Sequence, residues 1–234
     1  MKRLLVASTS TIHGSGYLEY LMPELSGFFQ GVGQLLFIPF ARPGGLSHEE
    51  YTSIAAKAFK KIDIDVKGLH EFDDMHTALL EAQAIFTGGG NTFLLVSQLY
   101  RHKVMATLRD VLHTGTPYLG TSAGSNICGL TMQTTNDMPI IHPPSFKTLG
   151  MLPFNINPHY LDPIAGSKHM GETRETRIKE FHHLNAVPVL GLREGSWLHV
   201  VGDEITLKGK LSARVFEQGK APYEIPSETT VDLQ

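Results

Sequence analysis

Residues 117–124 read Pro-Tyr-Leu-Gly-Thr-Ser-Ala-Gly, a short apolar run that leads into the pattern Gly-x-Ser-x-Gly. This pattern is typical of a sharp turn from a buried strand into a helix, which exposes the serine hydroxyl. The flanking glycines let the backbone pass through a crowded bend. Ser122 is therefore a candidate nucleophile, and the alternative is a glycine-rich turn that contains an incidental serine.

Similar apolar runs recur along the chain and indicate the fold class. Residues 4–7, 35–38 and 84–87 resemble 118–120 in being short, apolar and followed by turn-forming residues. Such runs are typical of strands buried in a parallel sheet. Because helical patterns lie between them, we expect an α/β fold with a mostly parallel sheet and helices on both faces.

The helical patterns carry their own boundary signals. Residues 47–50, Ser-His-Glu-Glu, form a capping box, and apolar residues then recur on one face as far as Phe59. Thr92 is expected to cap a second helix. Three apolar residues mark the inner edge of a third helix near 174–184: Ile178, Phe181 and Leu184.

After Pro188 the pattern changes to strand-like runs separated by glycines. These runs are residues 189–192, 197–201, 204–207 and 213–216. They predict antiparallel strands that close one edge of the sheet. A length of 234 residues with 41% hydrophobic content fits one domain that spans 1–234.

Composition narrows the classes of function and compartment. The net charge is −3 and no basic cluster occurs, which disfavours binding to nucleic acids or to anionic membranes. Cys128 is the only cysteine, so an internal disulfide is excluded and a reducing compartment is favoured. The apolar run near the N-terminus stops at Ser8, which predicts a strand rather than a secretory signal. No run reaches the ~18 apolar residues of a membrane span, so a cytoplasmic protein is expected.

A nucleophilic serine needs a base and an acid that orients the base. Among twelve histidines, His159 directly follows a strand-like run ending in Pro158, whose fixed backbone makes a rigid support. Glu194 lies in a Gly-flanked turn after another buried run, and a carboxylate there can fix the tautomer of the imidazole. The alternative is that His159 and Glu194 are ordinary surface residues without a catalytic role. Since Ser122 also follows an apolar run, one sheet edge is expected to gather the three side chains.

Residues 88–90, Gly-Gly-Gly, follow a predicted strand and open a helix. Such a loop can turn its N–H groups toward a bound oxygen. A phosphate cradle is the alternative, but the glycine spacings of phosphate-binding loops are absent. Beside a nucleophile turn, an oxyanion hole is favoured, with the N–H groups of Gly90 and Ala123 as donors.

Taken together, these stretches resemble peptidase E, the α-aspartyl dipeptidase family. The similar segments occur in the same order as in that family and span most of the chain: 37–41, 88–93, 120–126, 134–140, 156–160, 171–175 and 191–197. The resemblance implies a flavodoxin-like core related to class I glutamine amidotransferases, with serine in place of their nucleophilic cysteine. No cofactor or metal is implied.

The resemblance also implies the reaction and the roles of the residues. Ser122 would be the nucleophile, His159 the general base and Glu194 the acid, with Gly90 and Ala123 forming the oxyanion hole. The implied reaction is hydrolysis of dipeptides whose N-terminal residue is aspartate. A small dipeptide would therefore be the partner, and no nucleic acid or membrane is expected. The sequence leaves the oligomeric state open, with a homodimer among the alternatives.

Substrate selection needs a cation for the aspartate side chain. Arg174 matches the arginine to which the family assigns this role, and a guanidinium can bind a carboxylate through two hydrogen bonds. The alternative is that Arg174 belongs to a solvated, charged helix face. Asn136 and Asp137 are candidates for binding the substrate ammonium or for shaping the loop beside the nucleophile.

The sequence also allows other functions. A cyanophycinase-like serine hydrolase would act on another acidic peptide or amide. A metal hydrolase would use a group of neighbouring side chains whose spacing matches no common zinc pattern: His159, Asp162, His169, His182 and His183. A binding module without activity would retain the pocket alone, and amidotransferase chemistry would need a thiol at position 122.

Overall fold

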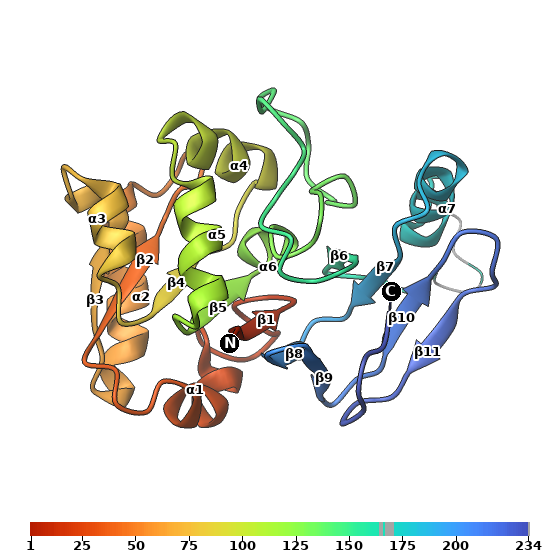
Figure 1. Cartoon of the computed structure of the whole chain (residues 1–234). Coiled ribbons are helices and arrows are strands. Elements are labelled where there is room, and N and C mark those ends of the chain that lie inside the picture. The colour runs from red at the N-terminus through yellow and green to blue at the C-terminus, as the bar shows by residue number, and fades with distance from the viewer. Residues whose placement is uncertain (164–165, 167–170, 234) are drawn as a thin grey trace.

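The computed structural model describes residues 1–163, 166 and 171–233. A seven-stranded sheet forms its centre (Figure 1). In spatial order its strands are β3 (Asp65–Gly68), β2 (Gln34–Ile38), β4 (Ile85–Thr87), β5 (Tyr118–Thr121), β1 (Arg3–Ala7), β8 (Ser196–Val201) and β9 (Glu204–Gly209). The first five are parallel, and β8 and β9 run antiparallel at one edge. The predicted mostly parallel, flavodoxin-like α/β architecture is confirmed.

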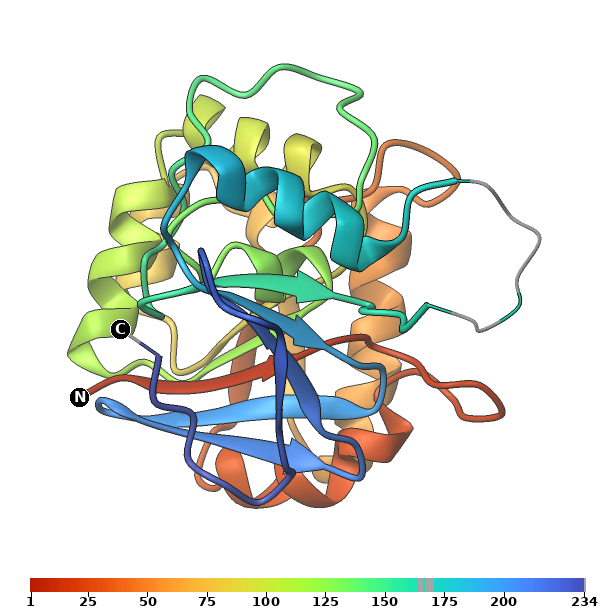
Figure 2. The ribbon, with the colours of Figure 1, turned by 90° about the vertical axis from the view of Figure 1, so that its right-hand side faces the viewer.

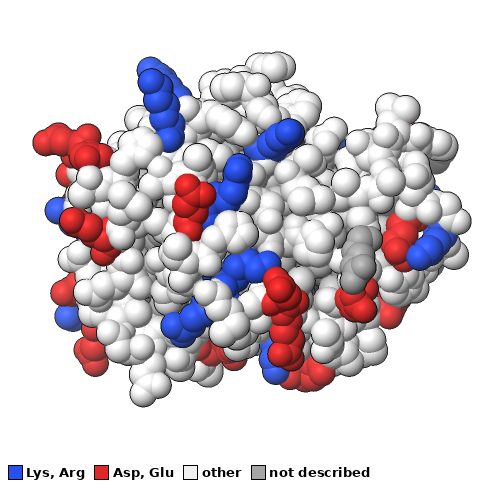
Figure 3. Space-filling model, in the orientation of Figure 1, with Lys and Arg blue, Asp and Glu red and all other residues white. Residues whose placement is uncertain are grey.

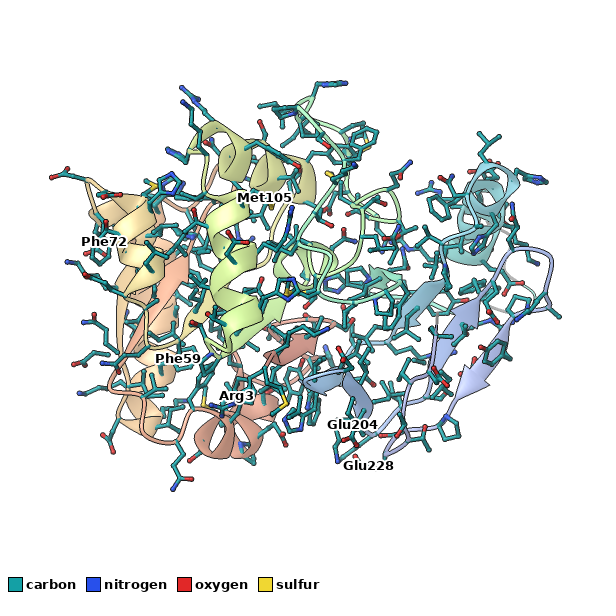
Figure 4. All side chains as sticks on the ribbon, in the orientation of Figure 1. Arg3, Phe59, Phe72, Met105, Glu204 and Glu228 are labelled. Atoms are coloured by element: carbon teal, nitrogen blue, oxygen red, sulfur yellow. The ribbon has the colours of Figure 1, made fainter. Side chains whose placement is uncertain are left out.

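Alternating side chains of the strands supply two apolar layers. Leu4 and Val6 of β1 face one core, whereas Leu5 and Ala7 face the other. The first core is covered by α3 (Met75–Leu80), α4 (Thr92–Arg101) and α5 (Met105–Thr114). The second is covered by α1 (Met22–Phe28) and α2 (His48–Phe59). Side chains fill the space between these layers (Figure 4), and short 3-10 turns lie at Glu19–Leu21, Lys60–Ile62 and Leu69–Glu71.

A second, four-stranded sheet lies beside the first (Figure 2). Its order is β11 (Tyr223–Ile225), β10 (Ala213–Phe216), β7 (Val189–Leu192) and β6 (Asn155–Pro158). The expected edge closure is therefore correct for β8 and β9 but wrong for β7 and β10, which belong to this second sheet. β6 and β7 are parallel, so their carboxyl ends lie side by side.

The capping box before α2 is confirmed. Ser47 Oγ accepts a hydrogen bond from the Glu50 N–H at 3.1 Å, and the Glu50 carboxylate accepts one from the Ser47 N–H at 2.8 Å. For α4 the cap is Asn91 rather than Thr92, because Asn91 Oδ1 accepts from the Leu94 N–H at 3.0 Å.

The third predicted helix is α7 (Arg174–Leu184), which packs against the second sheet through Ile178 and Phe181. Leu184 does not belong to its inner edge, since its side chain is 90% exposed. His182 is buried instead.

No helix within residues 1–163 or 171–233 is long and apolar enough to cross a membrane. On the face shown in Figure 3, acidic and basic side chains are interspersed. This distribution matches the absence of a basic cluster from the sequence. The organisation of the chain as one domain remains a prediction.

Candidate active site

Ser122 occupies a strained turn between β5 and α6 (Ala123–Asn126). Its backbone has φ 53° and ψ −108°, a region that residues with a side chain rarely adopt. The Ser122 N–H donates to the Ala7 carbonyl at 3.2 Å. Surrounding hydrogen bonds thus hold the serine at the carboxyl end of the large sheet, in the turn that the sequence pattern predicts.

The two glycines of the pentapeptide are required by close packing. A Cβ on Gly120 would lie 2.5 Å from the carbonyl oxygen of Gly124. A Cβ on Gly124 would overlap the carbonyl oxygen of Thr87 in β4. Only glycine at both positions therefore lets α6 pack this closely against the sheet.

The three side chains proposed as a catalytic group meet in space. His159 Nε2 lies 2.8 Å from Ser122 Oγ, and His159 Nδ1 lies 2.6 Å from Glu194 Oε1. They do not share one sheet edge, contrary to expectation. Ser122 follows β5 of the large sheet, whereas His159 and Glu194 follow β6 and β7 of the small one. The pairing of Pro158 with Leu192 explains why the last two are adjacent.

The backbone of His159 has φ 54° and is held by buried polar groups. Ser8, which is fully buried, accepts a hydrogen bond from the His159 N–H at 2.9 Å and donates one to the Leu192 carbonyl at 2.7 Å. It therefore joins the end of β1 to both strands that carry the imidazole and the carboxylate. The sequence gives no signal for this role, since Ser8 lies 151 residues before His159.

Asn136 lies beside His159 as well. Its Nδ2 donates to the Pro158 carbonyl at 2.6 Å, and its Oδ1 accepts from Asn157 Nδ2 at 2.8 Å. The side chain thus fixes the peptide that precedes His159.

The glycine loop lies against Ser122. A Cβ on Gly89 would be 3.0 Å from the Ser122 Cβ, and Gly90 has φ 147°, which glycine alone adopts readily. In the described part of the chain, neither the Gly90 N–H nor the Ala123 N–H donates a hydrogen bond to another residue. Both amides therefore remain available to an oxygen bound beside the serine.

Asp137 binds the start of α4, directly after this loop, and its carboxylate interacts electrostatically with Arg174. Asp137 Oδ2 accepts hydrogen bonds from the Thr92 N–H at 2.7 Å and from Thr135 Oγ1 at 2.9 Å. Arg174, the first residue of α7, is half-buried, and burial and the charge of Arg177 lower its pKa while the carboxylate of Asp137 raises it. Among the described residues Arg174 has no salt bridge. No described acidic side chain therefore occupies the donors of this guanidinium.

An ion-pair cluster lies next to Glu194. Arg193 contacts Asp162 at 2.7 and 2.8 Å and Glu224 at 2.8 and 3.0 Å, each through two hydrogen bonds. Burial is the largest single influence on Glu224 and raises its pKa, but the hydrogen bonds from Arg193, Ser212 and Arg214 together with the charge of Arg193 outweigh burial, and the pKa falls to about 2. The cluster ties the turn that carries Glu194 to β11.

The residues of the metal-hydrolase rival do not assemble as a metal site where they are described. Within residues 1–163, 166 and 171–233, no three His, Cys, Asp or Glu side chains are arranged to hold a metal ion. His169 lies outside the described residues. His159 is bonded to Ser122 and Glu194, and His182 Nδ1 to the Asn185 carbonyl.

Curated relatives match nearly the whole chain. A protein named peptidase E from Streptomyces coelicolor is 50% identical over 222 residues, which covers 95% of this chain and 90% of the relative. A probable alpha-aspartyl dipeptidase from Drosophila melanogaster is 47% identical over 227 residues, covering 96% and 93%.

Solved structures share the fold. A putative peptidase E protein from Listeria monocytogenes aligns with a TM-score of 0.68 at 21% identity, covering 89% of this chain and 98% of that one. A peptidase from an acI-B1 actinobacterium aligns with a TM-score of 0.71 at 16% identity, covering 100% and 97%. The model of peptidase family S51 matches residues 4–208. Because this family model covers most of the chain and the two curated relatives are 47% and 50% identical, the chain belongs to peptidase family S51.

Proposed function

We propose that this protein is a serine dipeptidase that hydrolyses dipeptides with an N-terminal aspartate. The observation that carries the proposal is the imidazole of His159, which is within hydrogen-bond distance of both Ser122 Oγ and Glu194 Oε1. This arrangement suits a serine nucleophile, a histidine base and an acid that orients the base. The names of the two curated relatives support peptidase chemistry on aspartyl dipeptides.

In the proposed reaction, His159 Nε2 takes the proton of Ser122 as Oγ attacks the peptide carbonyl carbon. The Gly90 and Ala123 N–H groups donate hydrogen bonds to the oxyanion that forms. His159 then gives the proton to the leaving amine as the C–N bond breaks, which leaves an aspartyl ester on the serine. Water, deprotonated by the same imidazole, releases aspartate and restores the hydroxyl.

Glu194 accepts a hydrogen bond from His159 Nδ1–H in this scheme. The bond fixes the tautomer in which Nε2 is free to accept the serine proton, and it stabilises the imidazolium that follows. Ser8 and Asn136 hold the backbone on either side of the Pro158–His159 peptide bond. The base is therefore supported from its side chain and from its main chain.

Specificity for aspartate would come from Arg174. Its guanidinium is half-buried and, among the described residues, makes no salt bridge, so it can bind the β-carboxylate of the substrate. Asp137 uses Oδ2 to bind the start of α4, which leaves Oδ1 for the substrate ammonium. In this proposal the role of Asn136 is to position His159, and Asn136 does not bind the substrate ammonium directly.

The decisive experiment compares Asp-Leu with Leu-Asp and with N-acetyl-Asp-Leu. Cleavage of Asp-Leu alone would support a dipeptidase that requires a free N-terminal aspartate. Cleavage of another acidic peptide or amide in preference to Asp-Leu would favour the cyanophycinase-like alternative. Ser122→Ala should abolish turnover while leaving the unfolding midpoint unchanged, and retained hydrolysis in this variant would refute the nucleophile.

A chelator control separates the remaining alternatives. Activity that survives exhaustive treatment with EDTA would argue against the metal hydrolase. A binding module without activity would fail to react with an uncharged fluorophosphonate, which labels activated serines. Labelling of the wild type, and none in Ser122→Ala, is the expected result.

A further inference from the structure

Tyr51 contacts the glycine loop, residues 88–90, through its hydroxyl. This residue of α2 is 1% exposed, and its hydroxyl donates a hydrogen bond of 3.1 Å to the carbonyl oxygen of Gly89. Gly89 is also the residue that packs on Ser122. A buried tyrosine thus reaches the peptide bond between Gly89 and Gly90, whose N–H is one of the two proposed oxyanion donors.

The geometry of a peptide bond links that contact to the amide. No cis peptide bond occurs among the described residues, so the carbonyl of Gly89 and the N–H of Gly90 point in opposite directions. When Tyr51 binds the carbonyl, the N–H must point away from Tyr51. The adjoining residues are fixed as well, because the Gly88 N–H donates to Ile38 at 3.2 Å and the Asn91 N–H donates to Ala41 at 2.7 Å.

Tyr51 and Ser122 pack against neighbouring residues of this loop. A Cβ built on Gly88 would lie 2.5 Å from the Tyr51 hydroxyl, whereas a Cβ built on Gly89 would lie 3.0 Å from the Ser122 Cβ. Since Tyr51 binds the Gly89 carbonyl and Ser122 packs against Gly89, a Gly90 N–H that points away from Tyr51 is placed to face the serine.

The tyrosine ring is itself held in place. Phe37 of β2 packs against it edge-on, with ring centroids 5.0 Å apart, and the guanidinium of Arg42 lies 4.9 Å from its centroid. These contacts involve the ring rather than the hydroxyl. A phenylalanine at position 51 would retain them and remove the hydrogen bond to Gly89.

We propose that Tyr51 is a positioning residue that orients the Gly89–Gly90 peptide bond so that the Gly90 N–H faces the oxyanion formed at Ser122. The hydrogen bond to the carbonyl also polarises the peptide group and strengthens the N–H as a donor. The proposal rests on the function proposed above, in which the Gly90 N–H stabilises the oxyanion.

The test is Tyr51→Phe. Removing one oxyanion donor outright lowers kcat by ~10²–10³, so a donor that is merely released from its orientation should cost roughly tenfold. We expect kcat for Asp-Leu to fall by about that factor with KM unchanged, since the ground-state carbonyl depends less on this N–H. Inhibition by the product aspartate should keep its wild-type constant.

Phosphonylation of Ser122 by an uncharged fluorophosphonate gives a second readout that needs no dipeptide. Its endpoint counts the folded, competent sites, and its time course gives the rate per site. The rate should fall by about the same factor in Tyr51→Phe. This measurement tests the proposal even if the wild type fails to cleave Asp-Leu, which would refute the substrate alone.

Tyr100→Phe is the matched control. Tyr100 in α4 also donates its hydroxyl to a backbone carbonyl, that of Lys147 at 3.0 Å, away from the glycine loop. It should keep the wild-type kcat and phosphonylation rate. The proposal is overturned if Tyr51→Phe phosphonylates at the wild-type rate per site, or if its loss appears in KM and product binding rather than in kcat.

Discussion

Replacing Ser8 with alanine should weaken both the fold and the proposed base. The serine hydroxyl is fully buried and makes two hydrogen bonds, one from the His159 N–H and one to the Leu192 carbonyl. The carbonyl of Leu192 keeps a second partner, since the Tyr160 N–H donates to it at 3.1 Å. Only the N–H of His159 is therefore left without an acceptor.

The size of the effect follows from this count. One buried, unsatisfied amide costs about 1–3 kcal/mol, so we expect a loss of about 2 kcal/mol in the free energy of unfolding. For a chain of this length that corresponds to a fall of roughly 4–8 °C in Tm. The left-handed backbone of His159 also loses one of its restraints, and a displacement of the base can lower kcat by up to about 100-fold.

The assay combines thermal unfolding with steady-state kinetics on Asp-Leu. Thr148→Val is the control, because Thr148 is also buried and donates its hydroxyl to a carbonyl, that of Gly129 at 2.7 Å, and among the described residues neither residue is hydrogen-bonded to His159. It should lower Tm and leave kcat unchanged. If Ser8→Ala lowers Tm but keeps the kcat of Thr148→Val, the serine is a structural residue only and the reasoning is wrong.

Three further outcomes are expected. Gly124→Ala should destabilise the protein by at least about 2 kcal/mol in urea unfolding, because its methyl group would overlap the Thr87 carbonyl oxygen, and wild-type stability would contradict this. Glu224 has a pKa of about 2 in the folded protein and a higher pKa in the unfolded chain. Its hydrogen bonds to Arg193 therefore stabilise the fold fully above about pH 4.5, and this stabilisation is lost as the pH falls toward 2. Glu224→Gln should flatten that part of the curve of Tm against pH. Arg174→Ala should abolish cleavage of Asp-Leu while Ser122 still reacts with the fluorophosphonate, and unchanged kinetics would rule out the role of Arg174.

Much of the fold could be predicted because its central strands are buried on both faces. Strands β1, β2, β4 and β5 are continuous apolar runs for that reason. β3 carries Asp65 and Lys67 and lies at the edge of the sheet, so it has no such run and was not predicted. The split into two sheets was also missed, because hydrophobic runs indicate strands but not which strands pair.

The candidate site could be predicted as far as local sequence marks it. Ser122, His159 and Glu194 each stand at a turn with glycine or proline beside it, and the structure brings them together. Ser8 and Tyr51 could not be found in this way. Their hydroxyls bond to backbone groups distant in sequence, and nothing in their neighbouring residues distinguishes them from an ordinary serine and an ordinary core tyrosine.

The division of the proposed triad between two sheets has a consequence for how the protein would lose activity. Ser122 follows a strand of the large sheet, whereas His159 and Glu194 follow strands of the small sheet. A small shift of one sheet relative to the other would therefore separate the serine from the histidine while every strand remains paired. Turnover should then disappear at lower urea concentrations than the far-ultraviolet circular dichroism signal. Activity would therefore report on the packing between the two sheets before the secondary structure is lost.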